Sequence, residues 1–219
     1  MIKIENLVKE YGEKDIKVTA VDNVNLEIKE GEFVAIVGCS GSGKSTLLNL
    51  IGGLDTPTCG KITIDGEDIS GYSDAKISEV RRKKIGIIFQ AYNLLPVLNV
   101  EENIKMPVLL DKQPVDQQYI DELIEMLGLS ERKNHLPNQL SGGQQQRVCI
   151  GRALANKPKI ILADEPTGNL DSKNSKEVME LIVKSAKKNN QTIVLITHEA
   201  DIAKMADRII TIEDGKIVE

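Results

Sequence analysis

Tryptophan is absent from the 219-residue sequence and aromatic residues make up only 3% of it, so we expect a core packed from aliphatic side chains. The uninterrupted apolar runs are short, such as FVAIV at 33–37, and fall far below the roughly 20 residues that a membrane-spanning helix needs. The N-terminal MIKIENLVKE has no basic segment followed by an apolar one, so we predict no secretory signal.

Cysteine is also scarce. Cys39, Cys59 and Cys149 are odd in number and widely spaced, which fits neither a disulfide framework nor a metal site and favours the cytosol. A net charge of -5 argues against a protein whose main partner is a nucleic-acid backbone, although a local basic patch is compatible with it. The length predicts one domain, or one domain with a subdomain, and no internal repeat is evident.

Short β-rich runs alternate with segments of helical period. The predicted strands are 32–38, 61–64, 85–89, 160–164, 192–197 and 208–212. Helices are expected after the glycine loop that follows the first of these strands, at 119–129 with Gly128 as C-terminal cap, and between 164 and 192; DGK at 214–216 indicates a turn. Prolines interrupt mainly helical stretches between about 90 and 157. We therefore predict an α/β core at 1–89 and 158–219 with an inserted helical subdomain at 90–157.

The stretch GCSGSGKST at 38–46 fits the pattern G-x-x-x-x-G-K-[ST] and lies between a predicted strand and a predicted helix. Backbone N–H groups of such a loop bind phosphate oxygens, and the helix N-terminus adds partial positive charge. Lys44 would then reach the β- and γ-phosphates, and the Ser45 hydroxyl would bind Mg²⁺. The alternative is a flexible loop that matches by accident. The predicted phosphate-binding residues are Gly38, Cys39, Ser40, Gly41, Ser42, Gly43, Lys44, Ser45 and Thr46.

Two adjacent acids end the strand at 160–164. Asp164 is placed to hold Mg²⁺ directly or through water, and Glu165 is the natural general base for the water that attacks the γ-phosphate. Without a phosphate loop in the same chain, the pair would be read as two solvated loop acids before a proline turn.

A second glycine pair follows in LSGGQQQRV at 140–148. Ser141 offers a hydroxyl, Gly142 and Gly143 leave backbone N–H groups open, and a helix beginning near Gln144 attracts anions at its N-terminus. Taken alone, this stretch favours a plainer interpretation, with Ser141 as a helix N-cap and the glutamines as a polar helix face.

The phosphate loop, the serine-glycine-glycine segment and the acidic strand together resemble the ATP-binding cassette (ABC) ATPases over essentially the whole chain, in the expected order. LSGGQQQ resembles the signature motif of that family. The resemblance implies an α/β fold: a P-loop NTPase core whose mixed sheet is flanked by helices, with an antiparallel β part and an inserted helical subdomain. It also implies that two such domains sit head to tail and that Ser141, Gly142, Gly143 and Gln144 of one cap the γ-phosphate bound by the other.

Four further positions match the family residue by residue. Gln90 resembles the Q-loop glutamine that contacts Mg²⁺ and the attacking water, and His198 resembles the switch histidine that hydrogen-bonds the γ-phosphate. Asp171 in GNLD resembles the D-loop aspartate at the dimer interface, and Tyr11 resembles the aromatic residue that stacks on adenine. From the residues alone, a histidine at a strand end is more often structural, and an isolated tyrosine there is explained by packing.

Within the family, the motifs resemble the subgroup of macrolide-efflux, lipoprotein-releasing and antimicrobial-peptide-resistance ATPases. The resemblance implies an ATPase that uses ATP and Mg²⁺, forms an ATP-dependent homodimer or heterodimer, and serves a separate membrane permease from the cytoplasmic face of the membrane. The permease would dock near Gln90 and the stretch 91–100, and export or mechanotransmission is expected. One alternative is a cell-division ATPase that signals without transport. Another is a soluble ABC protein acting on ribosomes or DNA, a class that usually carries two cassettes or long insertions absent from this sequence, so we expect no nucleic-acid partner.

The sequence departs from the family pattern at three positions. Cys39 stands where proline is common, and Cys149 and Gly151 stand where alanines are usual. A glycine within a helix is up to about 1 kcal/mol less favourable than alanine, so a close packing contact is expected at Gly151. Cys39, in a loop that opens a helix and near Lys44, is expected to have a lowered thiol pKa and to react readily; the alternative is a small buried filler.

Overall fold

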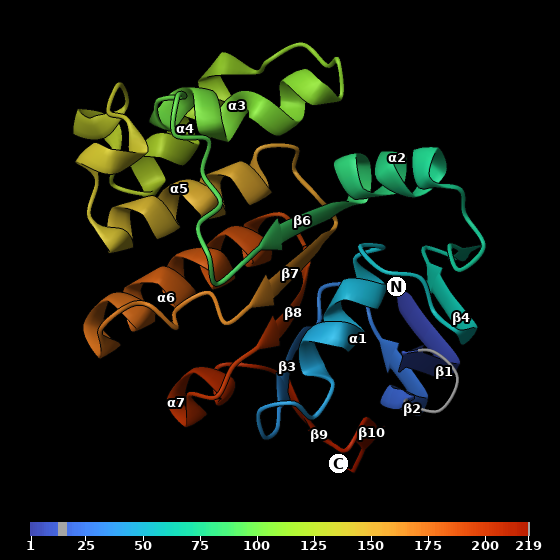
Figure 1. Ribbon diagram of the computed structural model, residues 1–219. Helices are drawn as coiled ribbons and strands as arrows, with labels where there is room; N and C mark the ends of the chain where they lie inside the picture. Colours follow the sequence, from blue (N-terminus) through green and yellow to red (C-terminus); the bar gives the residue numbers. More distant parts are fainter. Residues whose placement is uncertain (13–16, 219) are drawn as a thin grey trace. The chain divides into compact units, whose positions relative to one another are not determined.

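The computed structural model describes residues 1–12 and 17–218, and its internal contacts divide the chain into two compact units. The first unit comprises Met1–Arg81 and Thr192–Glu219, and the second comprises Arg82–Gln191. The segment 90–157, predicted to be a helical insertion, lies within the second unit, together with two strands and a long helix (Figure 1).

An antiparallel sheet forms one part of the first unit. Its order is β2-β1-β4-β5, and β1 pairs antiparallel with both β2 and β4. Apolar side chains of this sheet bury one face; in β1 they are Ile2, Ile4 and, beyond an irregularity at Asn6, Leu7. The strands are β1 (Ile2–Tyr11), β2 (Val18–Ile28), β4 (Cys59–Ile64) and β5 (Glu67–Asp68).

The other part of the first unit is a mixed sheet in which β3 lies between β8 and β9, parallel to both, while β10 pairs antiparallel with β9. The run from Phe33 to Ile36 in β3 is buried, as an apolar strand covered on both faces should be. The predicted turn between β9 and β10 is confirmed, with positive φ at Asp214 and Gly215. These strands are β3 (Phe33–Val37), β8 (Thr192–Ile196), β9 (Arg208–Glu213) and β10 (Lys216–Ile217).

Three helices accompany these strands. Helix α1 (Lys44–Ile51) follows the glycine loop as predicted and buries Leu47, Leu48, Leu50 and Ile51. Helix α7 (Ala200–Ala203) is a single turn after β8. Helix α2 (Asp74–Lys84) was not predicted, because it buries only Val80 and so carries no apolar stripe.

The second unit holds two parallel strands, β6 (Ile85–Ile88) and β7 (Ile160–Asp164), both predicted. Its helices are α3 (Val100–Leu110), α4 (Gln117–Met126), α5 (Gly142–Leu154) and α6 (Ser172–Lys188), with short 3-10 turns at Ser130–Arg132 and Pro137–Gln139. The expected cap at Gly128 is confirmed: its φ is +67°, and the N–H of Leu129 reaches back to the carbonyl of Ile124.

Gly151 is the point at which α5 lies against its neighbours in the second unit. A Cβ at this position would stand 2.9 Å from the terminal methyl groups of Ile104 and Leu127. The close contact expected from this glycine is therefore confirmed.

The α/β class, with an antiparallel part and a mixed sheet, is confirmed as well. Among the described residues, no helix is both long enough and apolar enough to span a bilayer.

Candidate functional site: a phosphate loop and a signature cavity

The phosphate loop of the first unit joins the end of β3 to the start of α1, and its glycines are required by its path. Gly38 has φ +148°, and a Cβ there would stand 2.2 Å from the carbonyl oxygen of Ile212. Gly43 has φ +101°, and a Cβ there would stand 2.0 Å from the carbonyl oxygen of Ala20. Larger residues would force the loop away from both neighbours.

Lys44 is buried, with 8% of its surface exposed, and the loop wraps around its ammonium group. Its Nζ donates to the carbonyl oxygens of Gly38 at 2.9 Å and Cys39 at 2.6 Å, and lies 3.5 Å from Oγ of Ser42. The N-cap of α1 is Gly43, and no side chain in the described part of the chain caps this helix. Its first N–H groups therefore suit a phosphate, which is what the motif predicts.

His198 leaves the mixed sheet on the same edge as the phosphate loop. Ile36 of β3 and Ile196 of β8 are partners in parallel register, and the N–H of Thr197 bonds the carbonyl of Ile36. Gly38 and His198 each lie two residues beyond this pair. The ends of neighbouring parallel strands meet at one edge of a sheet, so the first unit places the predicted histidine beside the predicted loop.

Tyr11 ends β1 and is 42% exposed. Its hydroxyl donates to Oδ2 of Asp55 at 2.6 Å. Burial of the phenol, and next the bond to Asp55, raise the pKa of Tyr11, while a hydrogen bond with the Thr46 hydroxyl opposes the rise. The tyrosine therefore lies against α1, next to the phosphate loop. The sequence did not indicate Asp55 as a site residue, because its partners are more than forty residues away in the chain.

The second unit brings Gln90 and Glu165 together. Ile88 of β6 pairs in parallel with Ala163 of β7, and Gln90 and Glu165 each lie two residues beyond their member of this pair. A Cβ on Gly168 would stand 3.0 Å from Nε2 of Gln90 and 3.5 Å from Oε2 of Glu165, so both side-chain ends reach the same glycine. Glu165 has φ +44°, a conformation that non-glycine residues adopt at an energetic cost and that is frequent at functional sites.

Asp164 is the last residue of β7 and is partly exposed. Its carboxylate and the exposed hydroxyl of Ser45 are oxygen donors of the kind that Mg²⁺ binds, usually through one or two protein groups together with substrate phosphates. Among residues 1–12 and 17–218, no group of three or more His, Cys, Asp or Glu side chains forms a metal cage.

Ser141 is the N-cap of α5. Its Oγ accepts from the N–H of Gln144 at 3.3 Å, and Oε1 of Gln144 accepts from the N–H of Ser141 at 2.9 Å. This capping box begins the helix, and the residues at the helix N-terminus line a cavity of about 450 Å³. The cavity is lined by Gly128, Ser141, Gly142, Gly143, Gln144, Arg147, Asn169, Leu170, Asp171 and Asn174.

Asp171 lines this signature cavity and is also the N-cap of α6. Its Oδ1 accepts from the N–H of Asn174 at 3.0 Å, and its Oδ2 accepts from the Asn174 side chain at 2.7 Å. The structure thus gathers all five residues predicted for the signature and the D-loop around one space in the second unit.

The segment that follows Gln90 is fixed to α5 by contacts that the motifs did not indicate. The carbonyl oxygen of Tyr92 accepts from Sγ of Cys149 at 2.8 Å and from Arg152 at 2.9 Å, and Arg152 also donates to the carbonyl of Asn93 at 2.6 Å. Burial raises the pKa of the Cys149 thiol to about 11, so this thiol remains protonated and acts as a donor. The only sequence signal was that cysteine replaces the usual alanine at this position.

Cys39 is exposed, which excludes the alternative of a buried filler. The thiol belongs to the phosphate loop itself, and its backbone carbonyl accepts from Lys44. A bulky group attached to its sulfur would therefore stand in the loop that the nucleotide is expected to occupy.

Comparisons with known proteins agree with this geometry. The model of the ABC transporter family matches residues 21–168. The chain is 50% identical over 223 residues to an uncharacterized ABC transporter ATP-binding protein, MJ1508, of Methanocaldococcus jannaschii, covering 100% of this chain and 98% of that protein. It is 45% identical over 220 residues to the macrolide export ATP-binding/permease protein MacB of Brucella melitensis, covering 100% of this chain and 34% of MacB.

A solved structure of the ATP-binding cassette MJ0796 superposes with a TM-score of 0.91 at 44% identity, covering 100% of this chain and 97% of that one. That structure is a dimer in a post-hydrolysis state, bound to ADP and Pi. The chain belongs to the ABC transporter family, and the class of enzyme expected from its motifs, an ATP-binding cassette ATPase, is confirmed.

Proposed function

We propose that this chain is the ATP-hydrolysing subunit of a transporter, and that two copies close head to tail around ATP to drive a separate membrane permease. The observation that carries the proposal is the signature cavity, where five residues and a helix N-terminus surround a space suited to a phosphate. The same chain carries a complete phosphate loop, so one chain supplies both halves of a shared site. The dimeric, ADP-and-Pi-bound MJ0796 structure supports this arrangement.

Lys44 and the N-terminus of α1 bind the phosphates of ATP, and Tyr11 stacks on the base. Ser45, Asp164 and Gln90 would hold Mg²⁺, which supplies positive charge against the charge that develops on the phosphates. Ser141 and the N–H groups after it bind the γ-phosphate held by the other subunit. Asp171 faces that subunit across the closed interface.

Glu165 accepts a proton from the attacking water as the water oxygen bonds to the γ-phosphorus, and the bond from that phosphorus to the β–γ bridging oxygen breaks. Gln90 lies next to Glu165 and orients the same water. His198 donates a hydrogen bond to the γ-phosphate. The products are ADP and inorganic phosphate, and loss of the shared γ-phosphate lets the subunits separate.

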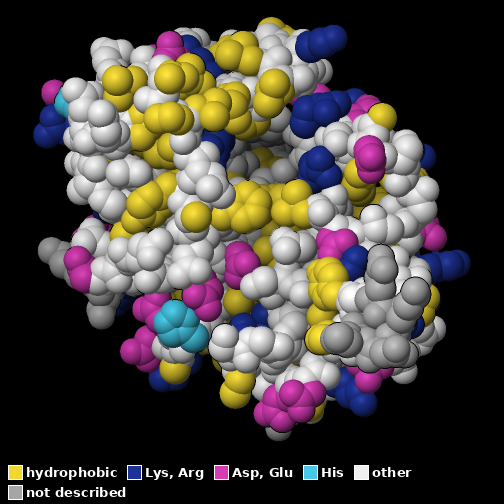
Figure 2. Space-filling view, viewed as in Figure 1, with side chains coloured by type: hydrophobic (Ala, Val, Ile, Leu, Met, Phe, Trp, Pro, Cys, Tyr) yellow, Lys and Arg dark blue, Asp and Glu magenta, His cyan; other side chains and the backbone are white. Residues whose placement is uncertain are grey.

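The proposed permease is a separate polypeptide. MacB carries ATP-binding and permease functions in one protein, and the present chain corresponds to about a third of it. Apolar side chains gather over α3 and α4 in the second unit (Figure 2), and the large exposed ones of this unit include Leu95, Val97, Leu109, Leu110 and Leu136. An exposed apolar patch supports a protein partner, which we propose docks on the stretch 91–100. Export or mechanotransmission of a lipoprotein, peptide or antibiotic, from the cytoplasmic face of the membrane, is the proposed task.

The variant Glu165→Gln tests the shared site. It keeps the shape of the side chain but removes the general base, so it should bind Mg-ATP, hydrolyse it very slowly and accumulate as a closed dimer. Light scattering coupled to size exclusion measures the mass. Lys44→Ala, which lacks the phosphate-binding ammonium, is the matched control and should remain monomeric. A monomeric Glu165→Gln protein in saturating Mg-ATP would refute the head-to-tail proposal.

Affinity capture tests the partner. Tagged Glu165→Gln protein is incubated in Mg-ATP with detergent-solubilised native membranes, and captured proteins are identified by mass spectrometry against the Lys44→Ala control. A four-helix permease with a large extracytoplasmic region is expected. Recovery of ribosomal or DNA-bound proteins without any membrane protein would leave the ATPase chemistry intact and overturn the transporter assignment.

A further inference from the structure

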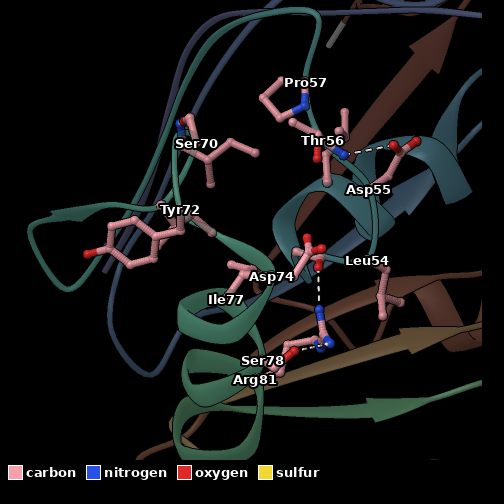
Figure 3. Close-up of a pocket in the computed structure, with 14 residues that line it drawn as sticks. Leu54, Asp55, Thr56, Pro57, Ser70, Tyr72, Asp74, Ile77, Ser78 and Arg81 are labelled. Carbon is pink, nitrogen blue, oxygen red and sulfur yellow. Dashed lines mark hydrogen bonds between the residues drawn. The ribbon is translucent and has the colours of Figure 1, made fainter.

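Asp55 connects two side chains of β1 to the loop that follows α1. Lys9 and Tyr11 are two residues apart on β1, and both side chains reach Asp55. Oδ2 of Asp55 accepts from the Tyr11 hydroxyl at 2.6 Å, and Oδ1 accepts from Nζ of Lys9 at 2.6 Å. The same Oδ1 accepts from the N–H of Thr56 at 2.7 Å, so the carboxylate is itself held in place (Figure 3).

This cluster is more buried and makes more hydrogen bonds than an exposed ion pair. The side chains of Lys9 and Asp55 are 13% and 27% exposed, and Lys9 also donates to the carbonyl of Thr56 at 2.8 Å. Burial alone would raise the pKa of Asp55, but the hydrogen bonds from Lys9 and Tyr11 outweigh it and lower the pKa, so the carboxylate is ionised at neutral pH. Charge-assisted bonds of this kind are short and strong.

The contacts within the cluster hold one end of the Tyr11 side chain and leave part of the residue exposed. Its hydroxyl is tied to Asp55, and the ammonium of Lys9 lies 4.8 Å from the ring centroid. Tyr11 nevertheless remains 42% exposed. A ring held at its edge, with surface still open, is prepared to stack on a flat ligand without first losing rotational freedom.

We propose that Asp55 is a positioning residue that orients Tyr11 for stacking on the base of the nucleotide. The inference rests on the proposed role of Tyr11 as the base-stacking residue. Asp55 itself touches no ligand; it acts through the tyrosine hydroxyl and through Lys9. Stacking is tolerant of base identity, so Asp55 strengthens the binding of adenine and guanine nucleotides alike.

Calorimetric titration with ADP and with pyrophosphate separates positioning from loss of structure, because the two probes share a diphosphate and only ADP has a base. In the full-length protein, Tyr11→Ala should raise the Kd of ADP roughly 5- to 100-fold, the range for losing one aromatic–base stack. Asp55→Ala should raise it roughly 2- to 10-fold, which corresponds to ordering one side chain upon binding. Both variants should bind pyrophosphate as the unchanged protein does. Glu5→Ala, which removes a lysine-paired carboxylate on β1 itself, is the matched control and should bind both probes normally.

ADP binding measured in the Tyr11→Phe background distinguishes a positioning role of Asp55 from a purely structural role. It keeps the ring and removes the hydroxyl, so most of the effect of Asp55→Ala on ADP binding should disappear there. An Asp55→Ala variant that binds ADP normally while Tyr11→Ala does not, or one that loses ADP and pyrophosphate equally, would overturn the inference. If Tyr11→Ala binds ADP normally, the stacking role itself is wrong, and that failure is recognised separately.

Discussion

Gly86 of β6 lies against α5, the helix that begins at the signature motif. A substitution of Gly86 should therefore disturb the packing of α5 on β6. A Cβ at this position would stand 2.3 Å from the carbonyl oxygen of Ala153 in α5 and 3.0 Å from Cγ of Pro158. Ordinary contact begins near 3.4 Å, so α5 or β6 would have to move by about 1 Å. Neither moves freely, because β6 is paired with β7 along its length and α5 is packed on α3 through Gly151.

The expected magnitude for Gly86→Ala follows from two opposing terms. Overpacking in a well-filled core is unfavourable by about 1–3 kcal/mol, and a clash with backbone belongs at the upper end. Removing a glycine restricts the unfolded chain and offsets about 0.4–1 kcal/mol. We therefore expect the free energy of unfolding to fall by about 2 kcal/mol and the Tm to fall by roughly 4–8 °C in a protein of this size. ATPase activity should fall as well, since β6 leads directly to Gln90.

Urea denaturation followed by circular dichroism measures the change in stability, with an unchanged m-value as the condition for comparison. Gly71→Ala is the matched control: nothing lies within 4 Å of the added methyl group, and its φ is not left-handed, so it should be neutral or stabilising by a few tenths of a kcal/mol. If Gly86→Ala is as stable as the unchanged protein, α5 does not need to pack this closely on β6, and the reasoning is refuted.

Four further predictions concern other groups. In a Cys59→Ser background, alkylation of Cys39 by iodoacetamide should abolish ATP hydrolysis and bound ATP should slow the labelling; equal labelling rates with and without ATP would contradict this. Cys149, whose thiol pKa is raised to about 11 by burial, should stay unlabelled at neutral pH in peptide mass spectra of the same samples. Asp171→Ala should lower stability by about 1 kcal/mol through loss of the α6 cap, whereas Asp171→Asn should keep stability, so that reduced ATPase activity in the asparagine variant would isolate the interface role. Burial alone would raise the pKa of Glu101, but hydrogen bonds from Lys105, Gln117 and Lys133 lower it. The stabilisation from a carboxylate with a lowered pKa is lost as pH falls through that pKa, so Glu101→Gln should lower stability by about 1 kcal/mol at neutral pH, and this difference should shrink as the pH of parallel urea titrations is lowered into the acid range.

The parts of the fold that were predicted correctly are those in which local chemistry decides the structure. The buried strands are continuous apolar runs, and Gly128 and the Asp214–Gly215 turn adopt the backbone conformations that their residue types favour. The antiparallel strands β1 and β2 were not located from periodicity, because Asn6 and Asn23 interrupt the alternation with left-handed backbone. Helix α2 was missed because it buries one apolar residue.

The candidate site likewise contains residues that local motifs predict and contacts that they do not predict. The phosphate loop and the signature are contiguous motifs, so their residues could be named from the chain alone. The contacts of Asp55 with Tyr11, and of Arg152 with the Tyr92 carbonyl, join segments 44 and 60 residues apart, and nothing in either segment by itself reveals its partner. Contacts of this kind depend on how the elements pack and become visible only in three dimensions.

The hydrogen bonds between the Lys44 ammonium group and the loop carbonyl oxygens have a consequence for product release. Because the loop already satisfies this ammonium, an arriving phosphate exchanges one set of hydrogen bonds for another, and the net gain is only their difference. In the proposed cycle, we expect the lysine to return to the carbonyl oxygens of Gly38 and Cys39 when ADP departs, instead of remaining buried and uncompensated. We therefore expect the loop to keep its shape between rounds of turnover, so that each new nucleotide enters a site that does not have to refold.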